Sequence, residues 1–335
     1  MAKPIALTLG EPAGIGPDIA LKAWLLRKEL NLPAFYLLGD HNFLERRAKT
    51  LDLHVEFAET RAEEASAAFA HALPVVSTGQ AATAQPGRPD ARSADAALAS
   101  IRQAVRDVRE GRASALVTNP IAKSVLYRAG FRHPGHTEFL AELAASNGQT
   151  PQPVMMLWSP ALAVVPVTIH TSLRAAIDGL STDLIVSTAR IVAAELKVRF
   201  GIARPRLAVS GLNPHAGEDG ALGTEDQTIV APAIEILHSE GLAARGPLPA
   251  DTMFHQAARQ TYDCAICMYH DQALIPIKTL AFDDAVNVTL GLPFVRTSPD
   301  HGTAFDIAGT GRANPASLIA ALRLAARMAA TAPAG

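Results

Sequence analysis

The sequence of 335 residues predicts an α/β protein with a largely parallel sheet. Short apolar runs alternate with helical stretches through most of the chain, as strand–helix–strand units require. Hydrophobic residues make up 49% of the chain and charged residues 19%, so it can bury a large core. A chain of this length divides more naturally into two lobes than into one.

Strands and helices are expected in turn through the first 120 residues. Apolar runs of strand length lie at 4–10, 34–40 and 114–120. Helical patterns follow or precede them at 16–30, 41–52 and 96–111. The last of these helices is the most amphipathic, and a polar stretch rich in turn residues leads into it at 81–95.

The rest of the chain continues this pattern around a hairpin. Residues 153–170 are the longest apolar region, but Ser159, Pro160 and Pro166 interrupt it. Two strands joined by a turn are therefore expected there, rather than a membrane span. Further strands are expected at 205–213, 264–270 and 285–298. Further helices are expected at 136–143, at about 173–199 and from 314 onward.

Charge and composition exclude several classes of protein. A net charge of −2 gives no basic field for nucleic acid or anionic lipid. Residues 1–16 lack the basic segment and apolar core of a secretory signal, so we expect a cytoplasmic protein without a membrane or nucleic-acid partner. Cys264 and Cys267 lie within an apolar strand pattern, on opposite faces. They are interpreted as core residues rather than as a redox pair or half of a zinc site.

The clearest chemical signal is a histidine at, or just after, the end of three expected strands: His170, His215 and His270. Three imidazoles leave a coordination position open, as in catalytic metal sites, and suit Zn²⁺ or another late first-row metal. Oxygen donors from a substrate would also admit Mg²⁺ or Mn²⁺. The alternative is that each is a hydrogen-bonded or phosphate-contacting histidine, but the coincidence of three favours a metal. Asp271 and Gln272 are expected to line the same pocket.

A second group of polar residues suits an anion. His136 and Thr137 are expected at a helix N-terminus, where free N–H groups favour a negative charge, although Thr137 alone would also be explained as an N-cap. Lys278, Asn287 and Arg296 are expected near strands or strand ends, where the two cations suit a phosphate or carboxylate. Taken singly, the cations would be interpreted as surface charges.

Two glycine-rich stretches form a third group. Residues 10–20, GEPAGIGPDIA, follow the first strand, but the glycine spacing matches neither a Rossmann nor a Walker A loop. Residues 300–322 contain several glycines and an Asn-Pro helix start. Glycines let a backbone approach a flat or phosphorylated ligand closely, but this stretch could also be a simple connection between strand and helix.

Six segments between residues 5 and 325 together resemble the family of 4-hydroxythreonine-4-phosphate dehydrogenase, which acts in vitamin B6 biosynthesis. They are GEPAGIGP, GHTE, GLNPHAGE, LPADTMF, MYHDQ and VNVTLGLPFVRTSPDHGTA. The stretch HGTAFDIAGTGRANP is also similar to the adenine-nucleotide loop of isocitrate and isopropylmalate dehydrogenases. The resemblance implies their two-domain α/β/α fold with an active-site cleft between domains. Residues 1–125 plus 285–335 would bind the nucleotide, and residues 126–284 would bind metal and substrate and form the dimer.

The resemblance also implies residue roles. The metal ligands would be His170, His215 and His270, with the site shared in a homodimer and the third histidine supplied by the partner subunit. The substrate contacts would be His136, Thr137, Lys278, Asn287 and Arg296. The nucleotide contacts would be Gly14, Gly16, Gly302, Thr303 and Asn314. Lys278, Asp251 and Asp271 are the candidate catalytic groups, and the sequence does not decide which of them removes the hydroxyl proton.

The implied reaction is oxidation of 4-phosphooxy-L-threonine by NAD or NADP, with a divalent metal (zinc, alternatively magnesium or cobalt), followed by decarboxylation. Such a metal lowers the pKa of the hydroxyl that loses hydride. Paralogous dehydrogenases of threonate or erythronate 4-phosphate, or of a dihydrodiol, would use the same histidines. A zinc hydrolase is an alternative from another class, and the glycine-rich loop at 300–314 counts against it because a hydrolase needs no NAD.

Overall fold

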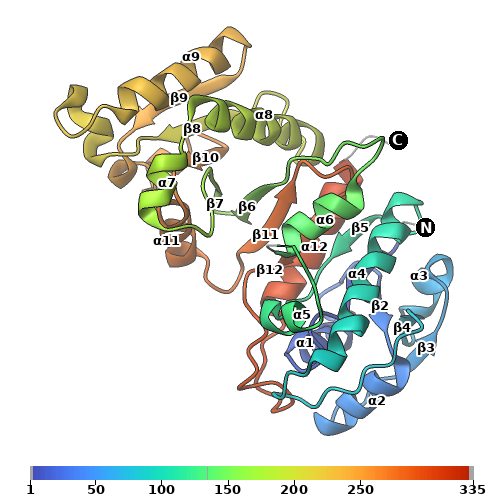
Figure 1. The fold of residues 1–335 in the computed structure, drawn as a ribbon. Coiled ribbons are helices and arrows are strands. Elements are labelled where there is room, and N and C mark those ends of the chain that lie inside the picture. The colour runs from blue at the N-terminus through green and yellow to red at the C-terminus, as the bar shows by residue number, and fades with distance from the viewer. Residues whose placement is uncertain (1–2, 134, 332–335) are drawn as a thin grey trace. The chain divides into compact units, whose positions relative to one another are not determined.

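The structure, a computed structural model, describes residues 3–133 and 135–331 (Figure 1). The chain divides into two compact units, and each is described by itself. The first contains residues up to 153 together with 292–330, and the second contains 154–291. Strands and helices alternate in both units, which confirms the α/β class. Among the described residues, no helix is both long and apolar enough to cross a membrane.

The sheet of the first unit is parallel, as expected. Its strands are ordered β3-β4-β2-β1-β5-β12. They are β1 (Ile5–Thr8), β2 (Phe35–Gly39), β3 (Phe57–Glu59), β4 (Leu73–Ser77), β5 (Ala115–Val117) and β12 (Arg296–Pro299). The expected strands at 4–10, 34–40 and 114–120 are confirmed, whereas β3 and β4 were not predicted. β3 is a three-residue edge strand and is not fully buried, so it lacks the apolar pattern of a central strand, whereas β4 begins with the buried apolar residues 73–75 and was overlooked.

Helices surround this sheet. They are α1 (Gly16–Leu25), α2 (His41–Thr50), α3 (Ala65–Ala68), α4 (Ala94–Arg109), α5 (Lys123–Arg128), α6 (His136–Ala144) and α12 (Ala316–Thr331), with the short 3-10 turns η1 (Ala62–Glu64) and η2 (Ala91–Ser93). Sequence determines where α2 begins, because the Asp40 carboxylate accepts a hydrogen bond from the Phe43 amide at 3.3 Å. The helices expected at 16–30, 41–52 and 96–111 are confirmed.

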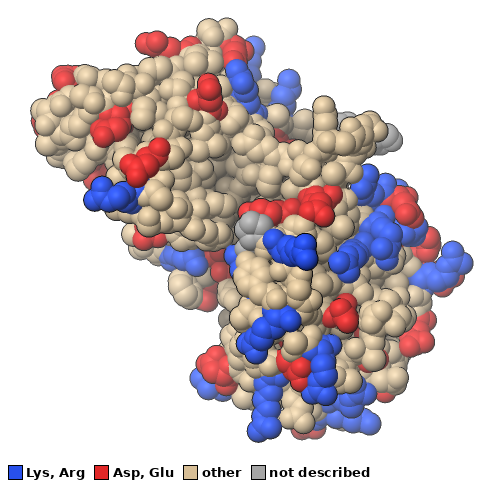
Figure 2. All heavy atoms as spheres, viewed as in Figure 1, with Lys and Arg blue, Asp and Glu red and all other residues tan. Residues whose placement is uncertain are grey.

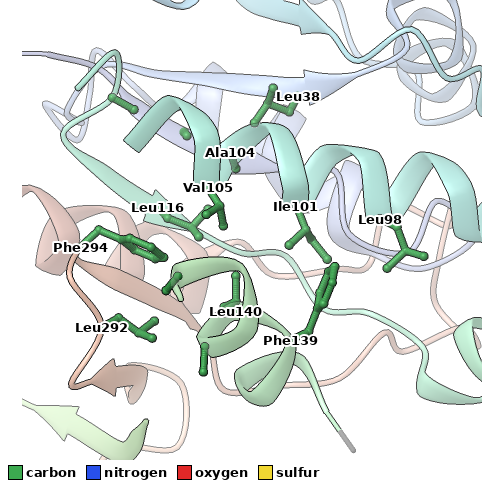
Figure 3. Close-up of a cluster of buried hydrophobic side chains, with 14 of the residues drawn as sticks. Leu38, Leu98, Ile101, Ala104, Val105, Leu116, Phe139, Leu140, Leu292 and Phe294 are labelled. Atoms are coloured by element: carbon green, nitrogen blue, oxygen red, sulfur yellow. The ribbon is translucent and has the colours of Figure 1, made fainter. Parts of the chain in front are cut away.

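The core of the first unit places α6 against α4 (Figure 3). Ile101 and Val105 of α4 lie at helical spacing and are fully or almost fully buried, and Phe139 and Leu140 of α6 lie in the same cluster. A fully buried side chain of this size contributes about 1.5–3 kcal/mol. Residues 126–153 therefore belong to the compact first unit, and the start of α6, which carries His136, is held in place by this packing.

The second unit has a mixed sheet, ordered β11-β6-β7-β10-β8-β9. Its strands are β6 (Val154–Ser159), β7 (Leu162–Pro166), β8 (Arg206–Ser210), β9 (Ala243–Leu248), β10 (Cys264–Cys267) and β11 (Val286–Leu290). β6 and β7 pair antiparallel, which confirms the hairpin expected at 153–170. β7, β10, β8 and β9 are parallel neighbours. Cys264 and Cys267 are free and buried in β10, as expected of core residues.

The helices of the second unit correct two expectations. They are α7 (Leu173–Gly179), α8 (Thr182–Arg199), α9 (Ala231–Ser239), α10 (Gln256–Arg259) and α11 (His270–Leu280), with the 3-10 turns η3 (Pro214–Gly220) and η5 (Ala250–Thr252) and the π-helical turn η4 (Asp226–Val230). The stretch 173–199 is two helices, because Ser181 caps α8 by accepting the Leu184 amide at 3.2 Å. The strand expected at 264–270 ends at Cys267, and His270 begins α11.

Candidate active site

A pocket of ≈ 240 Å³ lies in the second unit where β7 and β10 end. Because these strands are parallel neighbours, the segments that follow them leave the same edge of the sheet. His170 follows β7 and His270 follows β10, and their ring centroids are 5.8 Å apart. The structure therefore brings two of the three predicted metal ligands together. The pocket is lined by Thr168, His170, Thr171, Leu173, Ala176, Tyr269, His270 and Asp271.

His270 is oriented by its neighbour. Its Nδ1 lies 2.7 Å from Oδ1 of Asp271, so Nε2 is the ring nitrogen that could bind a cation. The other ring nitrogen of a metal-binding histidine almost always donates to a carboxylate, a backbone carbonyl or water, which fixes the ring and raises its basicity. Asp271 also places a negative charge in the first turn of α11, where it offsets the positive end of the helix. The donor set in this pocket thus fits a divalent metal.

His215 lies elsewhere in the second unit, in η3, and does not line this pocket. Within residues 3–133 and 135–331, no group of three or more His, Cys, Asp or Glu side chains is arranged to hold a metal. The backbone gives a further signal, because His170 and His215 adopt φ of 48° and 51°. Residues other than glycine rarely adopt the left-handed region, and such strain gathers at functional sites.

Gln272 does not line the pocket, contrary to expectation, and its amide points into the protein instead. It is 8% exposed, and its Oε1 accepts hydrogen bonds from Ser210 Oγ and the Met268 amide, both at 2.7 Å. Its Nε2 donates to the Gly211 carbonyl at 2.8 Å. The position of Gln272 in the first turn of α11, which was not predicted as a helix, turns the side chain away from that of Asp271.

The remaining predicted residues of the second unit lie outside the pocket lining. Asp251 is exposed in η5. Lys278 is on α11 rather than near a strand, and its Nζ lies 5.9 Å from the ring centroid of Phe282. Asn287 is half-buried on β11, as expected. The structure thus places Asp271 at the paired histidines, and Lys278 and Asp251 apart from that pocket.

In the first unit, α6 and β12 bring together His136 and Arg296. Gly135 is the N-cap of α6 and His136 its first residue, so Thr137 lies inside the helix and its interpretation as an N-cap is wrong. His136 Nε2 is buried and has no hydrogen-bond partner among the described residues. Burial, and then the charge of Arg296, hold the pKa of His136 well below its usual value.

Arg296 is buried on β12, with 3% of its surface exposed. Its Nε and Nη2 donate to Thr118 Oγ1 at 3.2 and 2.6 Å. Burial lowers the pKa of Arg296 to about 10, so the guanidinium remains charged at neutral pH. A buried cation beside a neutral imidazole with an unsatisfied ring nitrogen is chemically suited to an anion such as phosphate.

The two glycine-rich stretches meet in the first unit. The Ile15 amide donates to the Thr303 carbonyl at 3.0 Å, and a Cβ on Gly14 would lie 2.9 Å from that oxygen. A Cβ on Gly16 would lie 2.9 Å from the Leu9 carbonyl. Close packing of the chain on itself therefore accounts for both glycines.

A buried ion pair supports these loops. Arg47 and Asp18 are 1% and 0% exposed, and they contact each other directly. Arg47 Nη1 also donates to the Gly14 carbonyl at 3.0 Å, while Asp18 Oδ2 accepts the Gly309 amide at 2.7 Å. The pair therefore joins α1 and α2 to both glycine-rich stretches.

The outer side of the second glycine-rich stretch is accessible. Gly302 and Asn314 are exposed, and a Cβ on Gly302 would meet no atom within 4 Å. Asn314 Oδ1 accepts the Ala316 amide at 3.0 Å at the start of α12. An exposed loop on a rigid support fits a nucleotide-binding surface.

Sequence reasoning missed Glu11, which lies in the first glycine-rich stretch. It is 1% exposed, and its Oε1 accepts hydrogen bonds from Ser93 Oγ at 2.8 Å and the Ala13 amide at 3.1 Å. Oε2 has no partner among the described residues, and burial raises the pKa of this carboxyl. An acidic residue directly after a buried strand was the available signal.

Comparison with known proteins agrees with these features. The family described as pyridoxal phosphate biosynthetic protein PdxA matches residues 31–325. A relative from Bradyrhizobium diazoefficiens, a 4-hydroxythreonine-4-phosphate dehydrogenase, is 76% identical over 337 residues, which cover 98% of this chain and 98% of the relative.

Solved structures extend the comparison to the fold. A 4-hydroxythreonine-4-phosphate dehydrogenase from Klebsiella pneumoniae has 37% identity and a TM-score of 0.86, covering 98% of this chain and 100% of that one. A terephthalate 1,2-cis-dihydrodiol dehydrogenase from Burkholderia xenovorans has 28% identity and a TM-score of 0.65, covering 100% of each chain. These similarities confirm the fold class that the sequence predicts.

Proposed function

Because the chain belongs to the family of the pyridoxal phosphate biosynthetic protein PdxA, we propose that it is a 4-hydroxythreonine-4-phosphate dehydrogenase. It would oxidise the secondary alcohol of 4-phosphooxy-L-threonine, with hydride passing to NAD or NADP and the hydroxyl proton to a base. The product, 2-amino-3-oxo-4-phosphooxybutanoate, would lose carbon dioxide to give 3-amino-2-oxopropyl phosphate. The observation that carries this proposal is the His170–His270 pair in a chain 76% identical to a relative of that name.

The paired histidines would hold a divalent metal, zinc or alternatively magnesium or cobalt. The carboxylate of Asp271 on Nδ1 of His270 supports this assignment, because it keeps Nε2 available. When bound, such a metal would act as a Lewis acid that lowers the pKa of the substrate hydroxyl. Asp271 is the candidate base within the pocket, while Lys278 and Asp251 would have to act from outside its lining.

The phosphate of the substrate would be recognised by the first unit. Arg296 supplies a buried positive charge, and His136 supplies a neutral ring nitrogen without a partner among the described residues. Thr137, in the first turn of α6, adds a hydroxyl and a backbone amide beside them. Binding energy at this group would orient the alcohol, and Lys278 and Asn287 are proposed as the remaining substrate contacts.

The nucleotide would bind at the exposed loop that includes Gly302, Thr303 and Asn314. Its support by Asp18 and by the stretch containing Gly14 and Gly16 would keep the loop rigid, so that little conformational entropy is lost on binding. This assigns nucleotide binding to the first unit and metal binding to the second. The cytoplasm, where nicotinamide cofactors are plentiful, is the proposed location.

The active enzyme would be a homodimer with shared metal sites. α7, α11 and the segment after α11 carry large exposed apolar side chains: Leu173, which lines the histidine pocket, and Ile177, Ile275, Leu280 and Phe282. Ile275 and Phe282 are 64% and 75% exposed, which is unfavourable unless a partner covers them. Because His170 and His270 are paired within one chain, His215 of the partner subunit would complete the site.

Mixing two inactive variants tests this arrangement. His170→Ala and His215→Ala each remove a ligand, so each variant alone is expected to be inactive. In a mixed dimer, one site combines both substitutions while the other is intact. Subunits unfolded and refolded together should therefore recover about a quarter of wild-type activity under random pairing. Failure to recover activity, with mixed dimers shown to form, would place all the ligands within one chain.

Substrate preference tests the reaction itself. Formation of NADH or NADPH should be followed by absorbance with 4-phosphooxy-L-threonine, D-threonate 4-phosphate, D-erythronate 4-phosphate and a cis-dihydrodiol. A clear preference for the amino acid is expected. If the protein prefers a sugar acid or a dihydrodiol, the proposed hydride transfer stands but the proposed substrate is wrong. If no compound reduces either nucleotide and no nucleotide binds, the zinc-hydrolase alternative gains support.

A further inference from the structure

Gln272 makes contacts that join the two loops leading to His215 and His270. Its side chain is 8% exposed, and it makes three hydrogen bonds of 2.7–2.8 Å. Two go to Ser210 and Gly211, where β8 ends and the segment carrying His215 begins. The third goes to the Met268 amide, just after β10 and two residues before His270. One amide thus connects the loops of two proposed ligands.

Asp226 holds the next residues of the His215 loop. It is fully buried in the π-helical turn η4, a type of turn that is frequent at functional sites. Its Oδ1 accepts the Leu212 amide at 2.7 Å, and its Oδ2 accepts the Asn213 amide and side-chain Nδ2, both at 3.0 Å. A Cβ on Gly211 would lie 2.9 Å from Oδ1, so the loop is folded tightly onto this carboxylate.

The His215 loop requires such anchoring because its backbone is strained. His215, Ala216, Glu218 and Asp219 have φ of 51°, 55°, 44° and 52°. A run of left-handed residues other than glycine costs free energy and persists only when surrounding contacts determine it. Gln272 and Asp226 hydrogen-bond the segment 210–213, which leads into these strained residues.

We propose that Gln272 is a positioning residue for metal binding, because it fixes the strand-end segments that lead to His270, a ligand of its own chain's site, and to His215, which would complete the other site of the dimer. The inference rests on the proposed function, since it assumes that these histidines bind metal. Among the described residues, the hydrogen bonds of Gln272 reach these two segments alone, so its loss should move the ligands and not simply loosen the core. Groups that orient metal ligands in this way contribute about 10- to 100-fold to metal affinity.

The test is a titration of the whole protein with Co²⁺ alone, followed by its visible absorption. Gln272→Met keeps the length of the side chain but removes all three hydrogen bonds. Ser159→Ala is the matched control, because Ser159 is 2% exposed in the same unit and, within the described part of the chain, its hydroxyl bonds backbone groups of the β6–β7 turn alone. Gln272→Met should bind Co²⁺ about 10- to 100-fold more weakly with an altered spectrum, while Ser159→Ala should lower Tm and leave Co²⁺ binding unchanged.

Wild-type affinity and spectrum in Gln272→Met, with a lowered Tm, would make Gln272 purely structural and overturn the inference alone. Wild-type protein that binds Co²⁺ no better than His170→Ala would overturn the proposed metal site and this inference with it. If Gln272→Met does not fold, Gln272→Glu replaces it, since this nearly isosteric change keeps the acceptor for Ser210 and Met268 and places a carboxylate oxygen against the Gly211 carbonyl. It should also weaken Co²⁺ binding, and an unchanged affinity would contradict the proposal.

Discussion

Replacing Arg47 with methionine should destabilise the first unit strongly. Asp18 and Arg47 are 0% and 1% exposed, so the substitution leaves a carboxylate uncompensated in the protein interior. Removing one partner of a buried ion pair typically costs about 3–5 kcal/mol. Arg47 also donates to the carbonyls of Pro12 and Gly14, and these acceptors lose their partner as well. We therefore expect a loss of about 3–5 kcal/mol in the free energy of unfolding.

Urea denaturation followed by circular dichroism measures this loss. Arg92→Met is the matched control, because Arg92 pairs with Asp90 at the surface of the same unit, and its stability should stay close to wild type. The double variant Asp18→Asn/Arg47→Met removes both charges and should recover part of the loss. If the free energy of unfolding of Arg47→Met lies within about 1 kcal/mol of the wild-type value, which is the limit for an exposed pair, the reasoning from burial is refuted. Weakened NAD binding by Arg47→Met would further connect this pair to the nucleotide loop.

Three other predictions follow from the structure. The pKa of His136 is lowered in the folded state, so the unfolded chain binds the proton more readily. Tm should therefore fall as the pH drops below about 6.5, the usual pKa of histidine. His136→Asn should flatten that part of the Tm–pH profile. An unchanged profile would contradict this. Phe282→Asp or Ile275→Asp should yield monomers in analytical ultracentrifugation with little activity, whereas intact dimers would place the interface elsewhere. Cys264 and Cys267 are buried and their pKa values are raised, so a thiol reagent should label them only after unfolding; rapid labelling of the native protein would show that β10 opens.

The sequence predicts the central strands well because burial on both faces leaves continuous apolar runs, as at 34–40 and 153–170. It fails for the edge strands β3 and β9, which carry mixed residues, and it overlooks β4, whose apolar residues are interrupted by Pro74. It also fails for α11, whose HDQALIPIK begins with polar residues and contains Pro276. Local composition is a weak guide there, because tertiary packing of Ala273 and Ile277 decides the conformation.

For the candidate site, the sequence predicts that each histidine follows a strand, and parallel strands bring their ends to one edge of a sheet. The sequence could not predict that His170 pairs with His270 and not with His215, because this depends on the order of the strands in the sheet. Nor could the inward turn of Gln272 be predicted, because adjacent side chains on a helix point in different directions and the helix itself was not predicted.

Figure 2 shows acidic and basic side chains interspersed on the visible face, in keeping with the net charge of −2.

The division of the chain has a consequence for biosynthesis. The strands and helices of the second unit all lie in one segment, 154–291, whereas those of the first come from two segments separated by it. On the ribosome, the second unit can therefore complete its sheet before β12 and α12 have been made. α12 buries Leu318, Leu322 and Leu324, so the nascent first unit exposes the apolar surface that these residues cover until translation is nearly finished. The first unit is therefore the first to be synthesised and the last to complete its fold. Chaperone protection during synthesis should matter most for this unit.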